Sequence, residues 1–169
     1  MNEVALGTRS GRWVLATAVL GSGMVFLDGS VVNVALPTIG KDLGAGLSGL
    51  QWTVNAYLLT LASLILVGGS LGDRFGRRRI FVIGTIWFAA ASAVCGLAPN
   101  VGLLIAARGL QGIGGALLTP GSLALIQATF RQQDRARAIG AWSGLAGAST
   151  ALAPVLGGWL VSSVSWRAV

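Results

Sequence analysis

The chain has 169 residues, of which 54% are hydrophobic and only 10% are charged, and its formal net charge is +7. A soluble domain is about a quarter charged, so this composition excludes an ordinary soluble protein. With no histidine and a single cysteine, Cys95, the chain lacks the commonest metal ligand and has no intrachain disulfide. We expect no metal or organic cofactor, and any proton chemistry must use carboxylates.

Apolar runs long enough to cross a bilayer, about 20 residues each, occur five times along the sequence. The predicted spans are 13–36, 52–71, 80–97, 101–130 and 138–161. They predict an all-α membrane protein, preceded by an N-terminal segment at 1–12. Residues after 161 read like the entry to an unfinished sixth helix, so we expect the chain to be truncated there.

The first span could also be interpreted as a cleaved signal peptide, because Arg9 and Arg12 precede it. Its apolar run is too long for a signal, it contains Asp28, and no convincing cleavage site of small residues follows. We therefore interpret it as the first membrane crossing.

Lysine and arginine counts in the loops predict the orientation, since cytoplasmic loops carry the excess of positive charge. One side holds nine such residues, namely Arg9, Arg12, Arg74, Arg77, Arg78, Arg79, Arg131, Arg135 and Arg137. The other side holds only Lys41 and Arg167. This pattern predicts a cytoplasmic N-terminus, and it favours a membrane protein over a nucleic-acid-binding one. Aromatic residues at the span ends fit an interfacial belt, namely Trp13, Phe81, Phe130, Trp52 and Trp166.

Two ionisable residues, Asp28 and Arg108, lie inside predicted spans. Either one alone at mid-bilayer costs at least about 2.5–3.5 kcal/mol, so such residues are functional candidates. Both lie roughly 10–12 Å below the outer end of their span, and they can meet if the first and fourth helices are neighbours. Our hypothesis is that Asp28 loads and releases a proton under the influence of Arg108. A static ion pair, or an Arg108 that reaches toward the interface, is the alternative.

Glycine and proline are unusually placed within the spans. The pairs Gly68/Gly72 and Gly140/Gly144 have the small-xxx-small spacing that lets helices approach closely. The glycines around residue 112 superficially suggest a dinucleotide loop, but no strand precedes them, so helix packing is the better interpretation. The fifth span contains Pro154, Gly157 and Gly158, which predict a bend in this helix. The bend could act as a hinge or could simply be a fixed feature of the helix.

A short basic loop joins the second and third spans. Gly76 stands where the chain must turn sharply, and glycine can adopt a positive φ there. Asp73 ends the second span, an unfavourable place for a carboxylate, and Arg77 at i+4 could pair with it.

Four motifs resemble those of the major facilitator superfamily, in order and position. Segment 69–78 (GSLGDRFGRR) resembles the signature loop between its second and third helices. Segment 27–37 is similar to the first-helix motif of the drug:proton antiporter branch with fourteen helices. Segment 104–114 is similar to the fourth-helix motif whose arginine is linked to proton transfer. Segment 153–158 resembles the fifth-helix antiporter motif, although Ala153 stands where that family usually has glycine.

The resemblance implies two bundles of six helices, each made of inverted repeats, with the substrate site between them. This chain would supply five helices of the first bundle and lack the C-terminal bundle. In that family the basic loop closes against the second bundle and controls opening to the cytoplasm. The implied gating residues are Gly69, Asp73, Arg74, Gly76, Arg77 and Arg78.

The expected protein is therefore a bacterial inner-membrane exporter that exchanges protons for small amphiphilic or cationic compounds. Two alternatives remain open: a carrier of another metabolite from the same superfamily, and a non-transporting membrane module. An enzyme is not expected, because the sequence has no nucleophile–base pair, metal cluster or phosphate loop. The expected partners are the lipid bilayer, a small-molecule substrate, protons and the missing bundle, with no nucleic acid.

Overall fold

Five long helices make up nearly all of the computed structural model, which describes residues 4–169. They are α1 (Arg9–Leu43), α2 (Leu47–Phe75), α3 (Arg77–Gly96), α4 (Val101–Thr129) and α5 (Gln132–Ser163), followed by a 3-10 turn, η1 (Trp166–Ala168). All five are long and apolar enough to cross a membrane. Each predicted span falls on one helix, and α1 extends furthest beyond its span, to Leu43 rather than residue 36. Of the predicted N-terminal segment 1–12, residues 1–3 lie outside the described residues.

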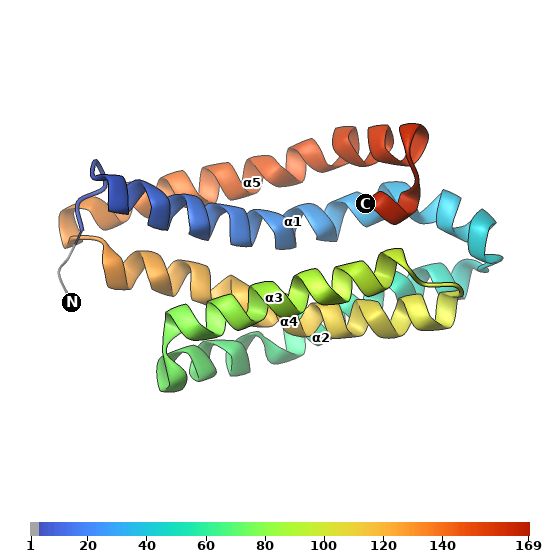
Figure 1. The fold of residues 1–169 in the computed structure, drawn as a ribbon, viewed down its shortest axis with the longest axis horizontal. Helices are drawn as coiled ribbons and strands as arrows, with labels where there is room; N and C mark the ends of the chain where they lie inside the picture. The colour runs from blue at the N-terminus through green and yellow to red at the C-terminus, as the bar shows by residue number, and fades with distance from the viewer. Residues whose placement is uncertain (1–3) are drawn as a thin grey trace.

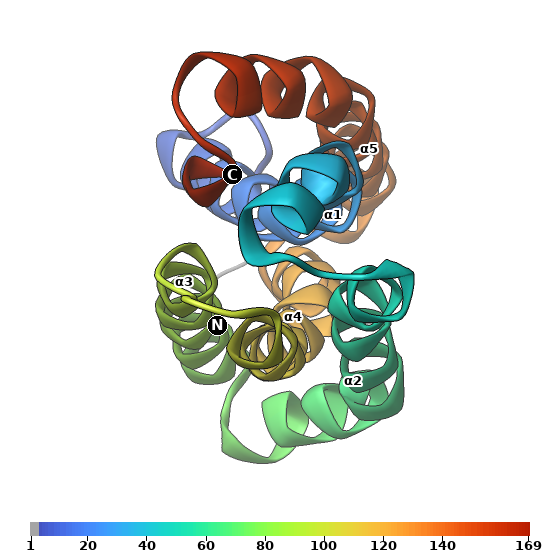
Figure 2. The same ribbon diagram turned by 90° about the vertical axis from the view of Figure 1, so that its right-hand side faces the viewer.

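The helices lie side by side along one long axis (Figure 1). Viewed from the end, α1 and α5 form one layer, and α4 lies between α2 and α3 in the other (Figure 2). The most extensive packing joins α4 to α2 and α3, and α1 to α5, while α1 also packs against α4. A polar residue on the inner face of α1 therefore faces α4.

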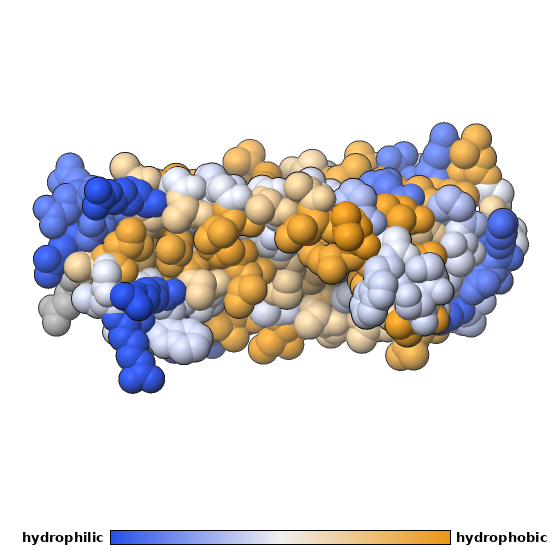
Figure 3. Space-filling model, turned by 90° about the horizontal axis from the view of Figure 1, so that it is seen from above, coloured by the Kyte–Doolittle hydropathy of each residue, from blue (hydrophilic) through white to orange (hydrophobic). Residues whose placement is uncertain are grey.

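The face of the bundle seen in Figure 3 is apolar along its middle and polar at its two ends. Large apolar side chains are exposed on the bundle, among them Leu66, Val155 and Trp159, with exposed fractions of 83%, 70% and 60%. Such a surface fits a lipid solvent, because helices satisfy their own backbone hydrogen bonds. We call the end that carries the nine arginines of the predicted cytoplasmic side the arginine-rich end.

The predicted aromatic belt is only partly correct. Trp13 and Trp52 are exposed, as a belt requires, but Phe81 and Phe130 are buried in the bundle core. Phenylalanine has no polar group to place among lipid headgroups, so packing decides its position. Trp166 is also buried, and its indole Nε1 donates to Asp42 Oδ2 at 2.7 Å.

Both ends of α1 are tied to other helices. At the arginine-rich end, the amide of Val4 donates to Thr129 O at 2.8 Å, and the amide of Leu6 donates to Asp134 Oδ2 at 3.1 Å. At the opposite end, the bond from Trp166 to Asp42 holds the last turn of α1. These contacts fix the segment just before α1 to α4 and α5, and the last turn of α1 to η1.

Gly76 alone links α2 to α3 and has a φ of +97°, as the sequence analysis predicted for this turn. A side chain in this conformation would be strained. The turn places the basic residues that follow at the end of the bundle.

We expect Asn100→Ala to lower the free energy of unfolding by about 0.5–2 kcal/mol. Asn100 is the N-cap of α4, and its Oδ1 accepts a hydrogen bond from the amide of Leu103 at 2.9 Å. Thermal unfolding of the purified full-length protein in detergent measures the loss. Asn100→Asp retains the acceptor and should unfold close to the parent protein; an equal loss in both variants would contradict the capping role.

Candidate functional site

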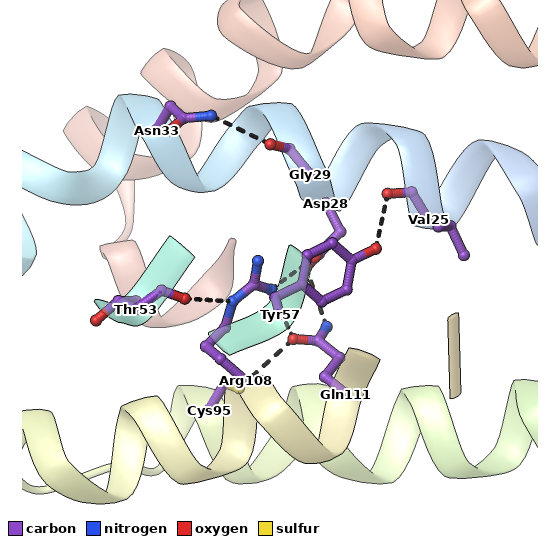
Figure 4. A network of polar contacts seen from close by, with 9 residues as sticks. All are labelled: Val25, Asp28, Gly29, Asn33, Thr53, Tyr57, Cys95, Arg108 and Gln111. Carbon is purple, nitrogen blue, oxygen red and sulfur yellow. Dashed lines mark hydrogen bonds and ion pairs between the residues drawn. The ribbon is translucent and has the colours of Figure 1, made fainter. Parts of the chain in front are cut away.

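An ion pair lies inside the bundle where α1 faces α4. The Arg108 Nη1 donates to Asp28 Oδ2 at 2.6 Å, so the contact that the sequence predicted for neighbouring first and fourth helices is present (Figure 4). The Arg108 side chain is 3% exposed and that of Asp28 is 13% exposed. The guanidinium is thus enclosed, while the carboxylate keeps some access to its surroundings.

Gln111, one turn along α4 from Arg108, bonds to both members of the pair. Its Oε1 accepts from Arg108 Nη1 at 2.7 Å, and its Nε2 donates to Asp28 Oδ1 at 3.0 Å. The Cys95 thiol on α3 also lies 3.6 Å from Gln111 Oε1. The three residues from α1 and α4 therefore form a closed ring of polar contacts.

Helix α2 holds the other side of the guanidinium. Arg108 Nε donates to the backbone carbonyl of Thr53 at 3.3 Å, and its Cζ lies 4.2 Å from the centre of the Tyr57 ring. The Tyr57 hydroxyl donates to the carbonyl of Val25 on α1 at 3.2 Å. Glycine makes this approach of α2 possible, because a Cβ at Gly112 would lie 2.6 Å from the Tyr57 carbonyl oxygen. Arg108 thus has neutral partners in addition to the carboxylate of Asp28.

A cavity of about 970 Å³ opens beside this network, between α1 and α3. Asp28, Arg108 and Gln111 line it together with Cys95, and most of the remaining lining is apolar. Within residues 4–169, every buried side-chain nitrogen and oxygen has a hydrogen-bond partner. The arrangement can hold a charged pair inside the bundle and still let a proton reach the partly exposed carboxylate.

The basic loop lies far from this pair, at the arginine-rich end. Arg77 Nε donates to Asp73 Oδ1 at 3.0 Å, the pairing that the i+4 spacing indicated. Arg77 Nη1 also reaches the carbonyl of Ala124 on α4 at 3.2 Å. Arg74 and Arg78 are exposed, and Gly69 faces Pro120 of α4.

The predicted hinge residues of α5 lie in a continuous helix. Gly157 packs against α1, where an added Cβ would lie 2.5 Å from Val31 Cγ2. Gly158 faces open space in the described region, and Pro154 is exposed. Of these three, Gly157 is the one that brings α5 close to α1.

The two glycine pairs with the same spacing behave differently. Gly68 meets the backbone of α4 at Ala116, whereas Gly72 has only ordinary contacts. Gly140 and Gly144 have no neighbouring atom within 4 Å of an added Cβ in the part of the chain described. The prediction of close packing is therefore wrong for that second pair within this bundle.

Sequence reasoning assigned no role to Thr53, Tyr57 or Gln111. Gln111 could have been found, because it is a polar residue three positions after Arg108 within a span. Tyr57 is the only tyrosine in the chain and lies within the second span, which is a weaker signal. Thr53 contributes a backbone carbonyl, which any residue carries, so the sequence contains no signal for it.

Comparison with known proteins finds a matching family and several bacterial relatives whose names refer to resistance or export. The sequence profile of the Major Facilitator Superfamily matches residues 18–169. The tetracenomycin C resistance and export protein of Streptomyces glaucescens is 47% identical over 167 residues, which cover 98% of this chain and 31% of that protein. The multidrug resistance protein Stp of Mycobacterium tuberculosis is 45% identical over 151 residues, covering 89% of this chain and 28% of that protein.

A third relative and a solved structure also match this chain. The methylenomycin A resistance protein of Bacillus subtilis is 44% identical over 161 residues, which cover 95% of this chain and 34% of that protein. The chain thus spans about a third of the length of these relatives. A solved bacterial homologue of the human lysosomal transporter Spinster, in an inward-facing and occupied conformation, has the same fold, with a TM-score of 0.78 and 24% identity. That likeness covers 95% of this chain and 39% of the solved one. Since the family profile covers all but the first turns of the structure, this multi-pass membrane chain belongs to the Major Facilitator Superfamily.

Proposed function

We propose that the full-length protein exports small amphiphilic compounds, cationic ones included, in exchange for protons. The described helices form most of its first bundle, and the C-terminal bundle completes the substrate site. Asp28 accepts and releases the coupling proton, and Arg108 biases the charge of that carboxylate. The proton is the coupling ion, and no metal or organic cofactor takes part.

The observation that carries this proposal is the pair formed by Asp28 and Arg108, 2.6 Å apart in the bundle core. Ionisable residues at membrane depth are expensive and mark ion or proton pathways. Within residues 4–169, Asp42, Asp73 and Asp134 lie at helix ends, so Asp28 is the acid placed to couple proton movement to events inside the bundle. The names of the relatives, which refer to resistance and export, favour an exporter over a carrier of nutrients.

The orientation belongs to the same proposal. The arginine-rich end carries nine positive side chains against two at the opposite end, which favours its location in the cytoplasm. The loop around Asp73 would then lie on the cytoplasmic side. We propose that it closes against the second bundle, and that Pro154, Gly157 and Gly158 allow α5 to bend during the cycle.

The test is efflux of a fluorescent amphiphilic cation, ethidium, from cells that express the full-length protein. We expect Asp28→Asn to reduce proton-driven efflux to the level of cells without the protein, because an amide cannot take up a proton at this position. Membrane levels of the variant are measured in parallel. Asp42→Asn, the same substitution at a helix end, should keep efflux near that of the parent protein.

Two results would speak against the proposal. Asp28→Asn with parental, gradient-dependent efflux would exclude Asp28 as the proton carrier. Parental efflux that does not respond to collapse of the proton gradient by a protonophore would exclude proton coupling altogether.

A further inference from the structure

The amide of Gln111 has a defined orientation because two donors face its oxygen. Arg108 Nη1 donates to Oε1 at 2.7 Å, and the Cys95 thiol approaches the same oxygen at 3.6 Å. Neither the guanidinium nor the thiol proton could face an NH2 group favourably. Gln111 Nε2 is therefore turned toward Asp28, where it donates to Oδ1 at 3.0 Å (Figure 4).

With this orientation, both carboxylate oxygens of Asp28 accept N–H donors. Arg108 donates to Oδ2 and Gln111 donates to Oδ1. Hydrogen bonds to an ionised group are about twice as strong as those between neutral groups. The network as observed is therefore complementary to the ionised carboxylate.

A protonated Asp28 does not fit the same arrangement. The proton would come from water at the partly exposed carboxylate, and the new O–H would need an acceptor. The side-chain acceptor in the ring formed by Asp28, Arg108 and Gln111 is Gln111 Oε1, which already accepts from Arg108. If the amide turned over to receive the O–H, its NH2 group would face the Arg108 guanidinium, and two donors would oppose each other.

From this conflict we infer that Gln111 is a positioning residue that makes proton binding at Asp28 break the contact between Asp28 and Arg108. The inference rests on the proposed function, because it explains how a proton on Asp28 changes the structure. An amide suits this task, since its donor and acceptor ends are distinct. A hydroxyl can rotate to donate or accept, and would tolerate both forms of the carboxyl group.

The test uses Gln111→Met in the full-length protein, because methionine keeps the length of the side chain and removes both polar ends. The loss of a donor to the ionised carboxylate should shift the pH dependence of efflux to higher pH by about one unit. Infrared difference spectroscopy of purified protein provides a second readout. The band of the protonated Asp28 carboxyl, identified by its loss in Asp28→Asn, should persist to correspondingly higher pH.

Two further variants test whether a change in packing, rather than loss of the amide, causes the shift. Gln111→Asn keeps a buried amide but withdraws it by one methylene, and should shift both readouts in the same direction. Ser122→Ala removes a fully buried hydroxyl of α4, which donates to the carbonyl of Leu118 on the same helix, and should leave both readouts unchanged.

The outcomes separate this inference from the proposed function. Parental pH dependence of the carboxyl band in Gln111→Met or in Gln111→Asn would overturn the role of Gln111, and so would an equal shift in Ser122→Ala. If efflux by the parent protein does not depend on the proton gradient, the proposed function fails instead, and the infrared titration still tests the amide.

Discussion

Replacing Arg108 by methionine should lower the free energy of unfolding by about 3–5 kcal/mol, the loss typical of a buried ion pair that has one partner removed. The substitution leaves the Asp28 carboxylate without its cation, and Gln111 Oε1 and the Tyr57 ring lose their contacts with the guanidinium. Methionine fills most of the space but supplies no donor. Unfolding of the full-length protein in mixed detergent micelles measures the effect.

The double variant Asp28→Leu with Arg108→Met is the matched control. Apolar replacement of both partners of a buried pair is often neutral or stabilising, because no unpaired charge remains. The double variant should therefore regain a large part of the stability lost in Arg108→Met, although it should not transport. A double variant less stable than Arg108→Met would mean that the charge of Asp28 is not what destabilises the single variant.

Replacing Gly68 by valine should separate α2 from α4 and lower the free energy of unfolding by at least about 3 kcal/mol, at the upper end of the range for overpacked cores. An added Cβ would overlap the carbonyl oxygen of Ala116 and lie 2.8 Å from its carbonyl carbon. Backbone atoms of a helix cannot move aside as a flexible side chain can. Pro120 explains why this carbonyl is available, because proline has no N–H to bond to the residue four positions earlier.

Unfolding in mixed micelles also tests this prediction, together with the amount of protein that reaches the membrane. Gly140→Ala is the control, because no atom lies within 4 Å of its added Cβ in the described structure. Alanine is the better helix former, by up to about 1 kcal/mol, so this variant should be as stable as the parent or more so. Equal losses at Gly68 and Gly140 would show that the close contact between α2 and α4 does not limit stability.

The helices and the ion pair were predictable because each depends on one strong and local signal. A run of apolar residues long enough to cross a bilayer has few folds open to it, since the backbone must satisfy its own hydrogen bonds. Asp28 and Arg108 stand out for the same reason, because charges are rare at that depth. Gly76 could be assigned to the turn between α2 and α3, because few other residues adopt a positive φ.

The sequence by itself therefore determined five crossings, the acid and the guanidinium at similar depth, and the basic turn. The tertiary structure decided which neighbours each residue has. The spacing of Gly68 and Gly72 equals that of Gly140 and Gly144, yet only Gly68 meets the backbone of another helix closely. Phe81 and Phe130 stand at helix ends in the sequence and lie buried in the core of the fold.

The same reason explains the parts of the site that the sequence did not reveal. The Thr53 carbonyl and the face of the Tyr57 ring reach Arg108 only because α2 and α4 approach closely at Gly112, whereas Gln111 reaches it from the next turn of α4. These contacts depend on how each helix is rotated and how far apart the helices lie. Rotation and separation depend on all the side chains packed between the helices rather than on any single residue.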